Sequence, residues 1–254
     1  MNKKVLITGA GSGFGKGTAV ALATRGHKVI ATTETEAQAI ALRAKHPQIQ
    51  VEKLDITSSV DVAKAATLDL DVLINNAGAG ETGPMADVPI DRVRHLFEVN
   101  VFGTLAVTQA VLPKMAAKKS GRIIIVSSIG GVIAGPSFGP YSMTKHALEA
   151  MGKSMRAELA ASGIDVTLIN PGPYNTGFND RMAASMWEWF GDKAISAPAT
   201  DLLRAIGSMV TTNQMDPVDV VNRLVELVEA ETTTENNFMP PEIRDLVKAQ
   251  INAG

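Results

Sequence analysis

The sequence predicts an α/β fold in which helices cover both faces of a doubly wound parallel sheet. Short apolar runs rich in Val and Ile alternate along the 254 residues with longer stretches of helical periodicity. Continuous β-branched runs are typical of strands that are buried on both faces of a parallel sheet. No linker or repeat interrupts the alternation, and α/β domains often reach this length as one unit. We therefore expect a single domain over residues 1–254.

Six apolar runs mark the predicted strands, and helices are expected between and after them. The strands are predicted at Val5–Ile7, Val29–Ala31, Ile49–Leu54, Val72–Ile74, Ile123–Val126 and Val166–Ile169, and the helices at 14–25, 35–45, 58–67, 90–118 and 141–161. Beyond Pro171 the pattern loosens, and residues 174–215 mix Met, Trp and Phe with Gly, Pro and Asn. We interpret this segment as a C-terminal substrate lid, followed by an amphipathic helix over 217–230.

Composition and charge exclude several classes of function. Hydrophobic residues make up 45% and charged residues 20% of the chain, which is typical of a globular protein. The 24 Lys and Arg nearly balance the 26 Asp and Glu, so net charge favours neither nucleic acid nor an anionic membrane as a partner. The absence of Cys excludes disulfides, Cys-based zinc sites and thiol catalysis. The four His have no partner at metal-ligand spacing, so we expect no metal site.

No targeting or membrane-spanning segment is predicted. The apolar run near the N-terminus is too short for a signal peptide, and no later stretch approaches 18 apolar residues. We therefore expect a cytoplasmic protein with no membrane partner.

A glycine-rich segment, Thr8-Gly9-Ala10-Gly11-Ser12-Gly13-Phe14-Gly15, connects the first predicted strand to the first helix. Glycines are needed where a strand turns sharply into a helix and a pyrophosphate approaches the backbone. The helix N-terminus also offers free N–H groups and a partial positive charge. The spacing differs from G-x-G-x-x-G, and Gly17 after Lys16 excludes a Walker A loop. For this segment alone, an ordinary glycine turn remains the alternative.

Tyr141 and Lys145 are four residues apart in a predicted helix and therefore share one helical face. A phenol has a pKa of about 10 and is a poor base at neutral pH. One charge at ~4 Å with an effective dielectric near 20 contributes about 4 kcal/mol, which would lower the phenol pKa by roughly 3. The pair is therefore a sensible acid/base. The spacing alone is also typical of surface pairs on helices.

Four motifs in this order and spacing resemble the short-chain dehydrogenase/reductase family, between about residue 3 and residue 178. They are T-G-x-x-x-G-x-G at Thr8–Gly15, an acidic residue after the third strand at Asp55, N-N-A-G at Asn75–Gly78, and P-G followed by Thr at Pro171, Gly172 and Thr176. The resemblance implies a Rossmann-like fold that binds NAD(P). It assigns to the cofactor Gly9, Ser12, Gly13, Phe14, Gly15, Thr33, Glu34, Asp55, Ile56, Asn76, Ala77, Gly78, Tyr141, Lys145, Pro171, Gly172, Tyr174 and Thr176.

The same resemblance implies a catalytic tetrad of Asn100, Ser128, Tyr141 and Lys145. Ser128 lies 13 residues before Tyr141, as in the family, although Ser127 is an adjacent alternative. Tyr141 would transfer the proton, and Ser128 would bond the substrate oxygen. Lys145 would bind the nicotinamide ribose and lower the pKa of Tyr141. Asn100 would hold a water that connects Lys145 to solvent.

The end of the second strand favours NAD over NADP. NADP-preferring relatives usually place Arg or Lys near position 34 or position 12, where this chain has Glu34 and Ser12. A carboxylate repels a 2′-phosphate and accepts a hydrogen bond from a ribose 2′-hydroxyl. NAD-preferring relatives usually carry Asp where this chain has Thr33, so NADP is not excluded. Glu34 could also simply face solvent.

An apolar or aromatic substrate is expected from the lid. Both Trp lie within residues 174–215, although aromatic residues make up only 4% of the chain. The expected substrate contacts are Ser128, Ile129, Phe138, Tyr141 and Trp187. The alternative is that the lid aromatics cover a sheet edge or a subunit contact. The segments around Ser128 and Tyr141 resemble the steroid- and retinoid-dehydrogenase branch.

The resemblance therefore implies an oxidoreductase that interconverts a secondary alcohol and a ketone with NAD(P). A dinucleotide-binding regulatory protein without chemistry is the alternative, but it would not need Ser128 and Tyr141. We expect a small-molecule substrate and a homodimer or homotetramer. Pro240 and Pro241 stand where many relatives have a C-terminal interface strand, which puts a tetramer built on that strand in doubt. Dimerisation through the helices at 90–118 and 141–161 remains open.

Overall fold

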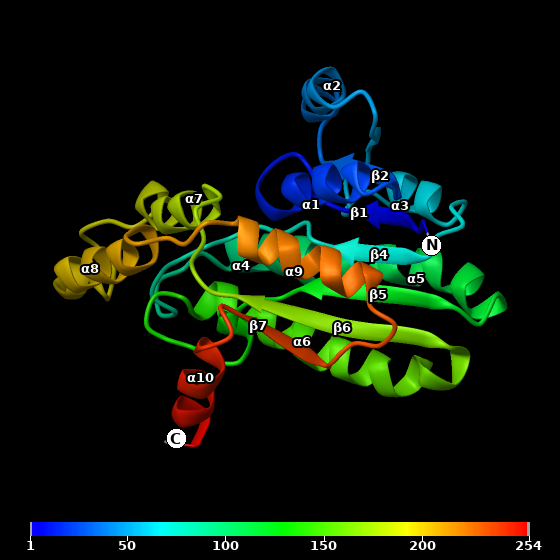
Figure 1. Cartoon of the computed structure of the whole chain (residues 1–254). Helices are drawn as coiled ribbons and strands as arrows, with labels where there is room; N and C mark the ends of the chain where they lie inside the picture. Colours follow the sequence, from blue (N-terminus) through cyan, green and yellow to red (C-terminus); the bar gives the residue numbers. More distant parts are fainter. Residues whose placement is uncertain (1, 253–254) are drawn as a thin grey trace.

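A seven-stranded parallel sheet forms the centre of the molecule in the computed structural model, which describes residues 2–252 (Figure 1). The strand order is β3-β2-β1-β4-β5-β6-β7, so the chain starts in the middle and winds outward in both directions. The strands are β1 (Lys4–Ile7), β2 (Lys28–Thr33), β3 (Gln50–Lys53), β4 (Val72–Asn75), β5 (Gly121–Val126), β6 (Ile164–Pro171) and β7 (Asn236–Met239). The predicted doubly wound parallel fold is confirmed.

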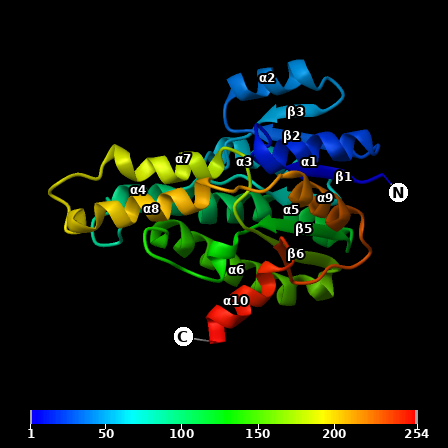
Figure 2. The same ribbon diagram turned by 60° about the vertical axis from the view of Figure 1, so that its left-hand side comes forward.

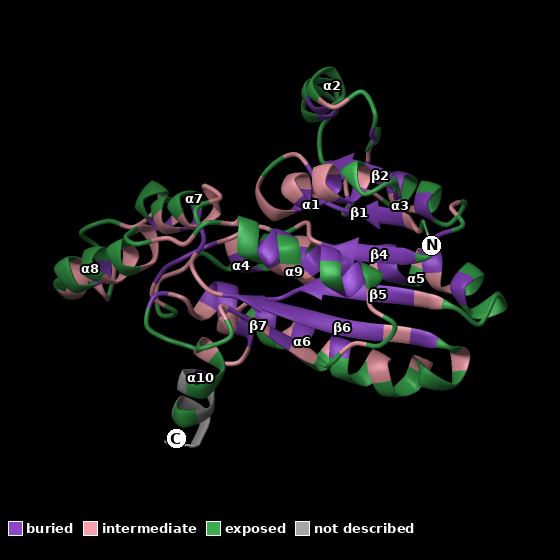
Figure 3. Cartoon of the chain, viewed as in Figure 1, coloured by how far each residue is buried: buried purple, intermediate pink, exposed green. Residues whose placement is uncertain are grey.

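Helices cover both faces of this sheet. They are α1 (Gly13–Thr24), α2 (Glu36–Lys45), α3 (Ser59–Ala65), α4 (Ile90–Phe97), α5 (Thr104–Ala117), α6 (Gly139–Leu159), α7 (Phe178–Ser185), α8 (Thr200–Thr211), α9 (Val218–Glu229) and α10 (Ile243–Asn252). Because side chains alternate along a strand, Val5 and Ile7 pack in the core formed with α1 and α9, whereas Leu6 packs in the core formed with α5 and α6. Figure 3 shows that the strands are buried along most of their length.

The predicted helix over 90–118 is interrupted by a π-helical turn. The turn covers Glu98–Gly103 between α4 and α5 and contains Asn100. By length and composition Ile90–Ala117 could cross a membrane, a possibility that the count of consecutive apolar residues missed. In the fold, α5 packs on β4, β5 and α3, with Val107, Val111 and Met115 buried, as an interior helix does.

The C-terminal strand β7 was not predicted. It pairs in parallel with β6 from Leu168 opposite Asn236 to Pro171 opposite Met239. Pro240 and Pro241 follow this strand, so they do not remove a donor from the ladder. The run Asn236–Met239 carries polar residues at an edge and lacks the apolar signal of a central strand.

The expected lid, residues 174–215, contains α7, α8 and short 3-10 turns. Its described residues include one isolated bridge, between Tyr174 and Met215, and no regular strand. Helices α7 and α8 pack against each other and project beyond the carboxyl ends of the strands in both views (Figures 1 and 2).

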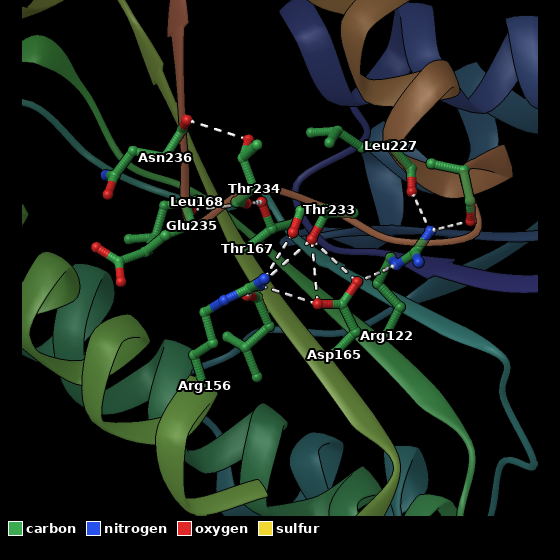
Figure 4. Close-up of polar contacts among 12 residues, drawn as sticks. Arg122, Arg156, Asp165, Thr167, Leu168, Leu227, Thr233, Thr234, Glu235 and Asn236 are labelled. Atoms are coloured by element: carbon green, nitrogen blue, oxygen red, sulfur yellow. Dashed lines mark hydrogen bonds and ion pairs between the residues drawn. The ribbon is translucent and has the colours of Figure 1, made fainter. Parts of the chain in front are cut away.

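An ion-pair network ties the amino ends of β5 and β6 to the connection between α9 and β7 (Figure 4). Asp165 accepts from Arg122 Nε and Arg156 Nη1, both at 2.9 Å, and from Thr233 Oγ1. Arg122 Nη1 also donates to the carbonyls of Leu227 and Ala230 at 2.6 and 2.7 Å. These bonds hold the last turn of α9 and the following loop against the sheet.

Candidate active site

A cavity of about 990 Å³ opens where the strands end. It is lined by residues that directly follow β1 to β6, including Gly9, Glu34, Asp55, Ser128 and Gly172. Ligands of doubly wound sheets bind at this carboxyl edge, near the point where the strand order reverses between β1 and β4. The cavity therefore lies where the fold predicts a binding site.

The glycine loop forms one wall and is built for close approach. Gly9 has φ +66°, and a Cβ there would lie 2.6 Å from Ala77 Cα. Thr8 Oγ1 accepts from the backbone N–H groups of Asn76 and Ala77, both at 3.0 Å, which joins this loop to the end of β4. Ser12 precedes α1 with its hydroxyl uncommitted to the helix cap. This wall fits the pyrophosphate of a dinucleotide.

Gly15 supports the glycine loop from behind. It is buried and does not line the cavity, and a Cβ there would lie 2.4 Å from Asn76 Nδ2. Asn76 Nδ2 in turn donates to the carbonyls of Thr8 and Gly9 at 3.0 Å. The structure therefore places Gly15 among the packing contacts of the loop, in contrast to its expected contact with cofactor.

Polar and acidic residues line the far end of the cavity, beyond the glycine loop. They include the expected Thr33, Glu34 and Asp55, and also Gln38, which sequence reasoning missed; the expected Ile56 lines the cavity here as an apolar neighbour. Gln38 and Thr35 cap α2 reciprocally, and the T-x-x-Q pattern was a signal that could have placed Gln38 there. No Lys or Arg lines this end among the described residues. The end is therefore electrostatically suited to hydroxyl groups more than to a further phosphate.

Three residues of the expected tetrad meet at the cavity, and the fourth lies directly behind it. Ser128, Tyr141 and Lys145 line the cavity, whereas Asn100 is 1% exposed and does not. Asn100 Oδ1 accepts from Ala79 N at 2.8 Å. A Cβ on Gly78 would lie 3.2 Å from that oxygen and 3.9 Å from Lys145 Nζ. Asn100 thus borders Lys145 from a π-helical turn, and such turns are frequent at functional sites.

The amide nitrogen of Asn100 is also hydrogen-bonded within the protein. Its Nδ2 donates to Ala79 O at 2.9 Å and to Thr144 Oγ1 at 3.0 Å. These contacts fix α6, which carries Tyr141 and Lys145, against the loop that follows β4. The structure therefore gives Asn100 a positioning role, and its expected water stays a prediction.

Burial sets the pKa values of the acid/base pair. It raises the pKa of Tyr141 to about 12, with a hydrogen bond from Ser128 acting in the opposite direction. Burial also lowers the pKa of Lys145 to about 8, against the attraction of Glu149. Lys145 Nζ lies 5.6 Å from the Tyr141 ring centroid and donates to Val126 O at 2.9 Å. The expected lowering of the Tyr141 pKa by Lys145 is not found: burial is the largest cause, and the opposing cause is the Ser128 hydrogen bond and not the Lys145 charge.

The opposite wall comes from the segment after β6. Pro171, Gly172, Tyr174 and Thr176 line the cavity, and a Cβ on Gly13 would lie 3.2 Å from Thr176 Cβ. The Tyr174 side chain is 1% exposed and packs edge-on against Phe14, with ring centroids 5.6 Å apart. The two walls thus form a narrow cradle, and the residues present fit a dinucleotide.

The expected substrate end is apolar, with one correction. Ile129 and Phe138 line the cavity as expected, together with Phe178 and Met182 of α7. Trp187 does not line it: this side chain is 36% exposed and stacks with Arg204, whose Cζ lies 4.3 Å from the ring centroid. Two residues later, Trp189 Nε1 donates to Glu81 Oε1 at 3.1 Å and joins the lid to the loop after β4.

The sheet, the glycine loop and the Tyr–Lys helix together define the class of oxidoreductases that bind a nicotinamide dinucleotide. Comparison with known families makes this specific, because the short chain dehydrogenase family model matches residues 3–187. The chain belongs to the short-chain dehydrogenase/reductase family, as the resemblance of its motifs indicated.

Three relatives of this chain are named as oxidoreductases or reductases. The uncharacterized oxidoreductase YusZ of Bacillus subtilis is 40% identical over 212 residues, 79% of this chain and 73% of that protein. The 3-ketodihydrosphingosine reductase of Bacteroides thetaiotaomicron is 38% identical over 182 residues, 69% and 65% of the two chains. The NADPH-dependent 3-dehydrocapnine reductase of Ornithobacterium rhinotracheale is 45% identical over 111 residues, 42% and 39% of the two chains.

Solved structures share the fold over nearly the whole chain. A short-chain dehydrogenase from Streptomyces avermitilis has a TM-score of 0.85 at 28% identity and covers 100% of this chain and 93% of its own. A family member from Burkholderia phymatum in complex with NAD has a TM-score of 0.79 at 24% identity, covering 97% and 92%. A Sphingobium yanoikuyae enzyme in complex with NADPH has a TM-score of 0.76 at 23% identity, covering 98% and 92%.

Proposed function

We propose that the protein interconverts a secondary alcohol and a ketone on an apolar or aromatic substrate, using NAD(P). The observation that carries the proposal is that Ser128, Tyr141 and Lys145 meet in one cavity whose other walls fit a dinucleotide. The bound nicotinamide supplies hydride transfer to or from the substrate carbon. The protein supplies proton transfer, orientation and charge.

Tyr141 is the proton donor in the reductive direction. Its pKa of about 12 keeps the phenol protonated at neutral pH, so it can deliver a proton to the substrate oxygen as the carbon accepts hydride. Ser128 lies beside it and donates a hydrogen bond to the same oxygen. Protonated Lys145 lines the same cavity and is placed to donate to the nicotinamide ribose. The relatives named as reductases of keto compounds support this direction.

We propose NAD(H) as the preferred cofactor. Glu34 lines the far end of the cavity, where no Lys or Arg is present among the described residues to bind a 2′-phosphate. The relative whose name includes NADPH dependence aligns with only 42% of this chain. Comparison of kcat/KM for NADH and NADPH tests this preference, and equal values would overturn it.

An apolar ketone is the proposed substrate because Ile129, Phe138, Phe178 and Met182 surround the end of the cavity next to Tyr141. The direct test follows NADH and NADPH oxidation at 340 nm with aryl ketones, steroid ketones, 3-oxoacyl esters and sugars. We expect turnover of the apolar ketones. Turnover of sugars alone would overturn the substrate class, and cofactor binding without any turnover would favour the regulatory alternative.

We also propose a homodimer or homotetramer in the cytoplasm. Phe102 in the π-helical turn and Met143 on α6 are 54% and 43% exposed, which supports association through these two helices. Light scattering of the purified protein tests the assembly, and a monomer would overturn it.

A further inference from the structure

Glu149 is a buried carboxyl group that the proposed chemistry leaves unexplained. It lies on α6, one helical turn after Lys145, and is 4% exposed. Among the described residues, its two oxygens accept only from side-chain amides: Asn170 Nδ2 at 2.6 Å and Asn236 Nδ2 at 2.7 Å. Charged residues are rarely buried without an ionic partner, because desolvation is costly. A buried acid held by two neutral amides in the described structure is therefore unusual and suggests a specific role.

The three side chains form a closed triad across three elements. Asn236 Nδ2, on β7, also donates to Asn170 Oδ1 at 3.1 Å, and Asn170 on β6 is 0% exposed. Asn170 Nδ2 donates in addition to the carbonyl of Ser128 at 3.2 Å. Asn170 directly precedes Pro171 and Gly172, which line the cavity. The triad therefore links α6 to the backbone of Ser128 and to the end of β6.

Lys145 is a buried cation with few partners. It is 5% exposed, and its one hydrogen bond among the described residues goes to the carbonyl of Val126. Positions i and i+4 lie on the same face of a helix, so Glu149 is the acid closest to Lys145 along α6. Glu149 is also the one charged group that acts on Lys145 in the described structure.

Among the described residues, the other acids on the elements that pack against α6 are exposed or paired elsewhere. Asp91 of α4 and Glu98 of the π-helical turn are exposed, and Asp165 of β6 accepts from Arg122 and Arg156.

The π-helical turn contributes the amide of Asn100, and the turn after β5 contributes the uncharged residues Ser128, Ile129 and Gly130 to the cavity. Beyond α6, strands β6 and β7 contribute the amides of Asn170 and Asn236, and α4 contributes His95 to the cavity lining. Tyr141 and His146 are the other titratable groups of α6 next to Lys145, and His146 Nδ1 lies 2.9 Å from the carbonyl of Ser142.

We propose that Glu149 is a positioning residue of the active site, whose buried charge keeps Lys145 protonated and whose amide bonds fix the backbone of Ser128. The proposal rests on the proposed function, because Lys145 and Ser128 are needed there. Glu149 does not line the cavity and acts through Asn170 and through the electric field along α6.

The test compares Glu149→Gln with Asn236→Ala across pH. Glu149→Gln removes the charge and nearly keeps the shape, so the loss of ketone reduction at alkaline pH should begin about one pH unit lower than in wild type. Asn236→Ala removes one bond to the carboxylate but keeps the charge, so its alkaline limb should stay within about 0.3 pH unit of wild type. Thermal unfolding of each variant shows whether the fold is retained.

NADH binding, followed by nucleotide fluorescence across pH without substrate, gives a second readout. The pH at which NADH binding is lost should shift by the same amount in Glu149→Gln even if no ketone is turned over. A failure of the proposed function can therefore be distinguished from a failure of the role proposed for Glu149. The proposal would be overturned if the alkaline loss occurred at the same pH in Glu149→Gln as in wild type, or if Asn236→Ala shifted it equally. The triad would then serve only to hold α6, β6 and β7 together. If Glu149→Gln does not fold, Glu149→Asp replaces it: the charge is kept, and a limb displaced by one pH unit overturns the proposal.

Discussion

The polar groups at the amino ends of the strands have many protein partners, whereas those at the carboxyl ends have few. At the amino ends of β5 and β6, Arg122 and Arg156 meet Asp165, and their remaining N–H groups donate to carbonyls and to Thr233. At the carboxyl ends, Lys145 has one carbonyl as its hydrogen-bond acceptor in the described structure. Buried polar groups normally have hydrogen-bond partners. The groups at the amino ends have theirs within the protein, whereas those at the carboxyl ends can still bind further partners.

Unpartnered polar atoms follow the same division. Of the four buried side-chain atoms without a partner in the described residues, Asn75 Oδ1, Ser127 Oγ and Tyr174 Oη belong to residues at or just after strand carboxyl ends. The pKa values of Tyr141 and Lys145 are displaced by burial at that end as well. The polar contacts at the amino ends of the strands stabilise the fold. The carboxyl ends keep polar groups without protein partners, which can bind a ligand but lower the stability of the fold.

The largest effect is expected from removing the proton donor. Tyr141→Phe should lower kcat for ketone reduction by about 10³-fold, because general acid catalysis contributes roughly 10²–10⁴-fold. NADH affinity and the thermal unfolding temperature should change little, since the ring and its packing remain. Steady-state kinetics at saturating NADH gives the answer, and a kcat within tenfold of wild type would refute the assignment.

A change at the opposite end should affect stability without affecting chemistry. Arg122→Met leaves Asp165 with one fewer cation and frees the carbonyls of Leu227 and Ala230. Arg122 is buried, but Asp165 is 26% exposed and keeps Arg156 as a partner, so the free energy of unfolding should fall by about 2–3 kcal/mol, measurable by urea denaturation. KM and kcat of the folded protein should stay near wild type.

Arg94→Met is the matched control for that change. Arg94 pairs with Asp91 at 2.8 Å, but both side chains are largely exposed, and such pairs contribute little. A loss of stability in Arg94→Met as large as that in Arg122→Met would contradict the division between the two ends.

Sequence reasoning reached the local part of the site and failed on the parts that depend on tertiary packing. The glycine loop and the Tyr141–Lys145 pair depend on spacing within one segment, so the pattern of residues predicts them. The raised pKa of Tyr141 depends on how deeply α6 is buried, which no local pattern encodes. Glu149 is similar: its partners Asn170 and Asn236 lie 21 and 87 residues away.

The lid shows the same limit. Its composition predicts an aromatic segment but cannot show which Trp faces inward. Trp187 is held outward by Arg204, and Trp189 is held inward by Glu81, 108 residues earlier in the chain. Likewise β7 depends on the edge that β6 offers, so its own four residues carry little signal.

A moderate effect is therefore expected from Trp189→Phe. Glu81 is 7% exposed and accepts from Trp189 Nε1 and Arg92 Nη1, both at 3.1 Å. Loss of the indole N–H leaves a buried carboxylate short of one donor, which costs about 1–2 kcal/mol and loosens the lid. KM for an apolar ketone should rise about tenfold with a smaller change in kcat, as steady-state kinetics would show. Trp187→Phe, the matched control, should leave KM unchanged, and equal effects of both variants would refute this contact.

The smallest effect is expected at the far end of the cavity. Glu34 lines the cavity and is exposed, so its repulsion of a 2′-phosphate is screened by water and salt. Glu34→Gln should raise the ratio of kcat/KM for NADPH to that for NADH by about fivefold at low salt. The gain should shrink in 0.5 M NaCl, because screening removes a purely electrostatic effect but not a lost hydrogen bond. Glu52→Gln, on an exposed position of β3 outside the cavity lining, should leave the ratio unchanged. A ratio that does not respond to Glu34→Gln at any salt concentration would mean that Glu34 faces solvent and that neutral groups such as Gln38 set the cofactor preference.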